Sequence, residues 1–135
     1  MIQVETLRES QAINYLYFSN ENGYKDGTIT SSYDEISNVI FEKHQSTYYL
    51  IKNLGNKSIS DIKDEFESKL LAQNIKSKRI VISISHSENM DLYNLGDISN
   101  YILDKFSYDD TVSIMRTKVD EDISDDTVGV ELLFV

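Results

Sequence analysis

Two helical segments are predicted by apolar residues that recur every three or four positions. In 58–74 this spacing places charged residues on the opposite side, and Ser58 or Ser60 can cap the first turn. The same period recurs over 91–106, and more briefly over 30–42, where Ser31 or Ser32 is the candidate cap. The residues predicted to face inward in the two longer helices are Ile59, Ile62, Phe66, Leu70, Leu71, Leu92, Leu95, Ile98, Ile102 and Phe106.

Four strands are predicted between and after these helices. The segment 46–55 is rich in β-branched and aromatic residues, and 79–85 is almost wholly apolar, as in a strand buried on both faces. The segments 111–119 and 127–135 read as two further strands joined by an acidic turn. This order predicts an α+β fold, an α/β sandwich with a mixed, mainly four-stranded sheet and two helices packed on one face.

The first 29 residues give a less regular pattern. Residues 1–19 mix a loose helical rhythm with a strand-like "NYLYFSN", and 19–28 contains two glycines preceded by polar residues, which is typical of a loop. We therefore expect a short N-terminal extension of mixed structure over 1–29, followed by one domain over 30–135.

Composition narrows the class of protein. The 135 residues are 40% hydrophobic and 27% charged, which suits one globular domain. The absence of cysteine excludes disulfides and thiolate metal sites. No apolar run approaches the roughly 18 residues that span a bilayer, and the N-terminus lacks a signal-peptide pattern, so we expect no membrane contact and a cytoplasmic location.

The charge is acidic and uneven. The chain carries a net charge of −10, of which −9 falls in residues 88–135. Nucleic-acid binding requires clustered basic residues, so we expect no nucleic-acid partner. The acidic part either serves solubility or faces a basic protein surface.

The loop between the apolar strand and the helix at 91–106 reads Ser85-His86-Ser87-Glu88-Asn89. A phosphate loop is not expected there, because the five glycines of the chain are scattered and Glu88 would repel phosphate. A catalytic Ser/His pair is not expected either, since adjacent strand residues point to opposite faces. We expect His86 to be a solvated loop histidine.

The turn "DEDISDD" over 120–126 holds five acids in seven residues. Its spacing is not that of a calcium loop, so the expected structure is an exposed acidic hairpin turn, with weak cation binding and a partner contact as alternatives. We expect no metal site and no cofactor.

The segment from about 30 to 135 resembles the C-terminal domain of FtsZ, the bacterial tubulin relative. The stretch "RIVISISHSENMDLYNLGDISNYI" is similar to the family's strand, Gly-Gly-Glu-Asp-Leu turn and helix, with His86 and Ser87 in place of the two glycines and Glu88 matching the acid. "TVSIMRTKVDEDISDDTVGVELLFV" is similar to its last two strands and their acidic turn, and "SYDEI" occupies the place of the Asn-x-Asp-Phe-x-Asp-Val loop.

The resemblance implies a fold without the family's GTP-binding loop, which this chain lacks. In the family, the loop before the first helix reaches the neighbouring filament subunit and completes its GTP site. Here Ser32 and Glu35 occupy the two acidic positions, Tyr33 replaces a phenylalanine and Asp34 lies between them. The loss of the first carboxylate argues against a catalytic role, so the resemblance leaves Ser32–Glu35 as a candidate filament-contact loop.

We therefore predict a noncatalytic protein-interaction module that binds FtsZ or a second copy of itself. The alternatives are a small-ligand protein or enzyme with a site at a subunit interface, and the C-terminal part of a larger FtsZ-like GTPase. An interaction module should show an exposed apolar patch, whereas an enzyme should show a pocket with convergent polar groups. The candidate partner-contact turns comprise His86, Ser87, Glu88, Asp120, Glu121, Asp122, Asp125 and Asp126.

Overall fold

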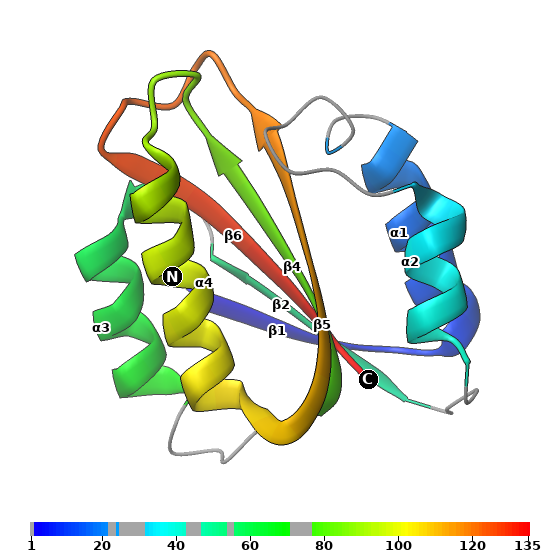
Figure 1. The fold of residues 1–135 in the computed structure, drawn as a ribbon. Coiled ribbons are helices and arrows are strands. Elements are labelled where there is room, and N and C mark those ends of the chain that lie inside the picture. Colours follow the sequence, from blue (N-terminus) through cyan, green and yellow to red (C-terminus); the bar gives the residue numbers. More distant parts are fainter. Residues whose placement is uncertain (1, 22–23, 25–31, 43–46, 54–55, 71–76) are drawn as a thin grey trace.

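A mixed β-sheet lies between two pairs of helices in the computed structural model of the chain (Figure 1). The structure describes residues 2–21, 24, 32–42, 47–53, 56–70 and 77–135. The strands are β1 (Ile2–Leu7), β2 (Tyr48–Asn53), β3 (Lys57–Ser58), β4 (Ser77–His86), β5 (Ser107–Val119) and β6 (Thr127–Phe134). The helices are α1 (Glu9–Glu21), α2 (Tyr33–Ile40), α3 (Ile59–Lys69) and α4 (Leu92–Phe106).

The strand order of the sheet is β1-β2-β6-β4-β5, and the short β3 pairs with β6 outside this path. Only β4 and β5 are parallel, because α4 connects them as a crossover; the other pairs are antiparallel. The last strand of the chain, β6, therefore lies in the middle of the sheet, while β1 and β5 form its edges.

The two helix pairs cover opposite faces of the sheet, and each has its own core. Helices α3 and α4 pack on one face through a cluster that includes Phe66, Ile98 and Phe106. Helices α1 and α2 cover part of the other face through a smaller cluster that includes Leu16 and Ile36. Figure 1 shows the sheet nearly edge-on between these two layers.

Serine caps start one helix in each layer. Ser32 precedes α2, and its Oγ accepts a hydrogen bond from the Glu35 N–H at 3.2 Å. Ser58 precedes α3 and accepts from the Asp61 N–H at the same distance. Each cap satisfies one of the backbone donors that a helix start leaves without a partner.

The predicted α+β fold with a mixed sheet is confirmed, but the numbers of strands and helices differ. Among the described residues the sheet has six strands rather than mainly four, and helices pack on both faces rather than one. The difference arises from β1 and α1, which the first 29 residues supply, from the two-residue β3, and from the placement of α2 beside α1. The division of the chain at residue 29 into an extension and a domain stays a prediction.

Two local predictions fail. The strand-like "NYLYFSN" lies in α1, where Ala12 and Leu16 face the core. Leu92 was expected to face inward, but it is 59% exposed; it is the first residue of α4, directly after the N-cap Asp91. Leu71, His44 and Ser31 lie outside the described residues.

No helix in the described part of the chain has both the length and the apolar character needed to cross a bilayer.

Candidate functional site

Two of the sequence-predicted contact regions meet at one end of the sheet. The backbone N–H of Asp120, at the start of the acidic turn, donates to the carbonyl of His86 at 2.8 Å. Across the same junction, Asn89 Nδ2 donates to Asp125 Oδ1 at 3.4 Å. Buried Met90 and Ile123 lie beneath these contacts. The two turns therefore form one surface.

The acids of this surface differ in exposure. Glu121, Asp122, Asp125 and Asp126 are exposed, as the expected hairpin turn requires, while Asp120 is half-buried and accepts the backbone N–H of Asp122 at 3.0 Å. Across the described residues, no three His, Asp or Glu side chains gather closely enough to hold a metal ion. The partner-contact role of this turn stays a prediction.

The prediction that His86 is a solvated loop histidine is wrong. Strand β4 continues to His86, which is paired with Val119 of β5 and is only 1% exposed. His86 Nδ1 lies 2.7 Å from the Ser87 carbonyl, which can only accept, so Nδ1 carries the proton. Ser87 is also buried, and neither its hydroxyl nor His86 Nε2 has a hydrogen-bond partner in the described part of the chain. Of these three turn residues, only Glu88 presents an exposed side chain.

The third predicted region, Ser32–Glu35, lies at the start of α2. The side chains of Asp34 and Glu35 are exposed in the first turn, where the helix dipole favours acids. Within the described part of the chain, no hydrogen bond, ion pair or ring contact joins this region to the two turns. The structure thus gives two separate candidate contact surfaces.

Tyr33 joins this region to an exposed aromatic cluster on the outer helix layer, formed by Tyr17, Phe18 and Tyr33. The rings of Tyr17 and Tyr33 meet edge-on with centroids 5.3 Å apart, and Tyr17 meets Phe18 at 5.7 Å. Tyr17 is 48% exposed and Phe18 61%. Two large aromatic side chains therefore face solvent beside the predicted filament-contact loop.

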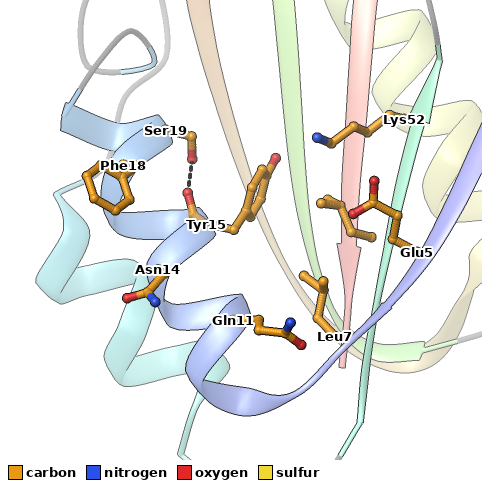
Figure 2. A pocket seen from close by; sticks show the side chains of 9 residues that line it. Glu5, Leu7, Gln11, Asn14, Tyr15, Phe18, Ser19 and Lys52 are labelled. Atoms are coloured by element: carbon orange, nitrogen blue, oxygen red, sulfur yellow. Dashed lines mark hydrogen bonds between the residues drawn. The ribbon is translucent and has the colours of Figure 1, made fainter.

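A groove of about 450 Å³ runs between α1 and the neighbouring strands β1 and β2 (Figure 2). Figure 2 shows Tyr15 reaching from α1 toward the sheet, with Glu5 and Lys52 projecting from the strands opposite. The groove is lined by Glu5, Leu7, Gln11, Asn14, Tyr15, Phe18, Ser19, Leu50 and Lys52. Phe18 belongs both to the groove and to the aromatic cluster, so the two features are continuous.

A row of polar side chains crosses the same face of the sheet beneath α1. Strand register places Lys52 opposite Glu131, Glu131 opposite Ser83, and Ser83 opposite Arg116. The neighbouring row, one pleat away on this face, is Leu50, Leu133, Val81 and Ile114. The face is thus apolar where α1 and α2 pack on it and polar beyond.

Glu131 is held by two tyrosines. The hydroxyl of Tyr15 donates to Glu131 Oε2 at 2.6 Å, and that of Tyr24 donates to the same oxygen at 3.4 Å. Burial, followed by the negative charge of Glu131, raises the pKa of both tyrosines well above their usual value. Both hydroxyls therefore stay protonated and act as donors.

Arg116, on the edge strand β5, is the last residue of the polar row. Its guanidinium carbon lies 4.5 Å from the ring centre of Tyr24 and 5.8 Å from that of Tyr15. Its Nε donates to Ser83 Oγ at 2.7 Å, and its Nη2 donates to Ser19 Oγ at 2.7 Å. Ser19 also lines the groove, so a single hydroxyl separates the guanidinium from the groove wall.

Sequence reasoning missed this polar row. The signal was present as polar residues spaced by two, which share one face of a strand: Ser83 and Ser85 in the mainly apolar β4, and Arg116 and Lys118 in β5. Reading 79–85 as apolar on both faces concealed it. What could not be read was the register that aligns these positions across four strands.

Comparison with known proteins shows a similarity of structure. No family model matches the chain, and no curated protein matches it. Among solved structures, an empty FtsZ dimer from M. jannaschii is similar, with a TM-score of 0.59, a probability of 1.00 and 16% sequence identity. The match covers 92% of this chain and 38% of that chain.

This coverage exceeds the share of the chain that residues 30–135 make up, so the likeness extends into residues 1–29. The chain spans well under half of the FtsZ chain that it matches. At 16% identity the similarity concerns the fold alone. This chain therefore has an FtsZ-like fold, consistent with the resemblance of its sequence to the C-terminal domain of FtsZ.

Proposed function

We propose that this chain is a noncatalytic protein-interaction and assembly module, which contacts an FtsZ subunit or a second copy of itself. The observation on which this proposal rests is the exposed aromatic cluster of Tyr17, Phe18 and Tyr33, continuous with the groove through Phe18. Aromatic residues are enriched at interfaces because they bury a large area with few rotatable bonds. Solvent-facing aromatic groups of this kind mark contact sites rather than ordinary surface.

The FtsZ-like fold supports the same proposal. The similar structure from M. jannaschii is a dimer of FtsZ, so that protein contacts another subunit. Tyr33 and its neighbours occupy the region that the resemblance marks as a filament-contact loop. The proposed setting is the cytoplasm, and cell division is the process that the likeness suggests.

Co-sedimentation with assembled FtsZ from the same cell, with and without GTP, tests the FtsZ partner, and sedimentation velocity of the chain alone tests self-association. We expect Phe18→Ser to weaken the observed association at least about tenfold, as for a hot-spot aromatic residue. The matched control is Tyr93→Ser, because Tyr93 is 81% exposed on α4 in the opposite helix layer. This control should change the affinity by less than about twofold.

Two outcomes would contradict the proposal. One is that the chain neither co-sediments nor self-associates. The other is that Phe18→Ser and Tyr93→Ser leave the association equally strong. Thermal melting of both variants serves as the folding check, since substitutions at exposed sites usually change stability by less than about 0.5 kcal/mol.

The groove favours a second candidate function, the binding of a small ligand. Its wall combines apolar Leu7 and Leu50 with oppositely charged Glu5 and Lys52, a mixture typical of ligand sites. A fragment screen observed by NMR would support this function if shifts were confined to the groove residues and Leu50→Glu removed them. It would count against this function if no fragment moved those resonances.

A further inference from the structure

The Arg116 guanidinium is wholly buried, yet part of it has no hydrogen-bond acceptor. Arg116 is 0% exposed, and its Nε and Nη2 donate to two serine hydroxyls. Its Nη1 has no hydrogen-bond partner among the residues that the structure describes. Among the described residues, no carboxylate forms an ion pair with it. A buried charge is normally paired with an opposite charge, because neutral hydroxyls replace only part of its lost hydration.

A second cation lies beside the first. Lys118 is two residues further along β5 on the same face and is half-buried, with its Nζ 5.0 Å from the ring centre of Tyr24. The same ring is 4.5 Å from the guanidinium carbon of Arg116. One tyrosine thus covers both cations.

Two serines complete a block on strands β4 and β5. Register places Ser83 opposite Arg116 and Ser85 opposite Lys118, and both serines are buried. The Ser83 hydroxyl accepts from Arg116 Nε and keeps its own hydrogen to donate. Ser85 is engaged with the Tyr24 hydroxyl, so the block offers the guanidinium, the ammonium and the Ser83 hydroxyl as donors.

The acid in the same row, Glu131, forms no ion pair with this block among the described residues. Glu131 lies directly opposite Lys52 and receives the hydroxyl hydrogen bonds of Tyr15 and Tyr24. It pairs with β4 at Ser83 and is thus separated from Arg116 by a strand. Two cations consequently gather without a direct ion pair to a described carboxylate, in a chain whose net charge is −10.

We propose that the block of Ser83, Ser85, Arg116 and Lys118 is a binding site for a small oxyanion, of the carboxylate or phosphate class. The oxyanion accepts from Arg116 Nη1 and Lys118 Nζ, which supplies the acceptor that Nη1 lacks. The same chemistry is offered by a free anion and by an acidic side chain of a protein partner.

The free-anion source is tested on the full chain by titration with sodium acetate and, separately, with sodium phosphate, at an ionic strength held constant with sodium chloride. The readouts are the side-chain Nε–H resonance of Arg116 and the thermal midpoint. We expect the resonance to shift with saturation, and the midpoint to rise by about 2 °C or more, because a ligand of the folded state stabilises it.

Lys118→Gln is the decisive variant, and Lys78→Gln is its matched control, because Lys78 is exposed on β4 and forms an ion pair with exposed Asp110. Lys118→Gln should weaken the anion response at least tenfold, whereas Lys78→Gln should leave it within twofold. Arg116→Met should abolish the response to acetate and phosphate. If that variant does not fold, the comparison of Lys118→Gln with Lys78→Gln still tests the site.

The protein source is tested in the co-sedimentation and self-association experiments. Without a response to acetate or phosphate, selective weakening of partner binding by Lys118→Gln assigns the site to an acidic side chain of the partner. The proposal is overturned if Lys118→Gln and Lys78→Gln behave alike in both the anion titration and the partner-binding experiments. Water would then be the hydrogen-bond partner of Arg116 Nη1. The anion arm uses the chain alone, so its result is independent of the proposed function.

Discussion

The two faces of the sheet are built from alternate residues of the same strands, yet they differ in chemistry. On the face toward α3 and α4, strand β4 is apolar from Ile80 to Ile84, with Ile80, Ile82 and Ile84 all buried in one cluster. The face toward α1 and α2 changes within the same strand from Val81 to Ser83 and Ser85. Because strand side chains alternate between faces, one strand stabilises the core and supplies polar groups at once.

The comparison teaches where stability and recognition lie. The α3/α4 face buries the larger cluster and fixes the register of the sheet. The α1/α2 face has the smaller core, the groove, the polar row and the exposed aromatic cluster. We infer that substitutions on the first face act mainly on folding, and those on the second mainly on binding.

The largest expected effect is at the centre of the α3/α4 core. Phe106 is fully buried and touches Phe66 and Phe134, with ring centroids 5.6 Å away in each case. Phe106→Ala should lower the free energy of unfolding by about 4 kcal/mol, because it leaves a cavity. Urea denaturation measures this. Phe18→Ala is the control on the opposite helix layer and should lower the free energy of unfolding by less than about 0.5 kcal/mol. Equal losses in the two variants would contradict the inference that stability lies mainly on the α3/α4 face.

A smaller effect is expected in the polar row. Tyr15→Phe removes the hydroxyl that donates to Glu131 at 2.6 Å, and should lower the free energy of unfolding by about 1–2 kcal/mol. The measurement is again urea denaturation at neutral pH. An unchanged or increased stability would show that the row is not held together by this bond.

The same variant has a signature in pH. Burial and Glu131 raise the pKa of Tyr15 in the folded state, so the unfolded chain loses this proton first, near its ordinary pKa of about 10. The contribution of protonated Tyr15 to the free energy of unfolding is therefore complete below pH 10 and is lost as the pH rises above it. Tyr15→Phe should make this alkaline decline shallower by up to about 1.4 kcal/mol per pH unit. An identical decline in both proteins would contradict the assignment.

The smallest effect compares the two helix caps. Ser32→Ala and Ser58→Ala each remove a cap that accepts a 3.2 Å hydrogen bond, so each should cost about 1 kcal/mol. If Ser32 also belongs to a contact loop, only Ser32→Ala should weaken association in sedimentation experiments. Equal effects of the two variants on association would reduce Ser32 to a structural cap.

The sequence predicted the elements after residue 30 well because their periodicities are strong. Helices α3 and α4 show a clear 3.6-residue repeat, and Ser32 and Ser58 act as caps as expected. Residues before 30 were harder, since the apolar positions of α1 are few and weakly periodic and β1 is an edge strand with exposed Val4. A short edge strand needs little hydrophobicity and leaves little signal.

The site was predicted only in part, for a physical reason. The sequence located Tyr33 and the two turns, but it placed His86 in solvent because a polar loop seemed to begin at Ser85. Strand β4 continues past that point, since β5 pairs with it as far as Val119. The polar row depends on register among four strands, which is a tertiary property that no local pattern encodes.

The central position of β6 has a consequence for the order in which the chain folds. Strand β6 joins β2 to β4, and without it the remaining ladders are β1–β2 and β4–β5. During synthesis β6 leaves the ribosome after the other strands of this sheet, so we expect the two ladders to have unpaired edges until it arrives. Such edges pair readily with other chains. The interval before β6 inserts is therefore the period in which a nascent copy is most exposed to aggregation, and in which a chaperone has most to protect.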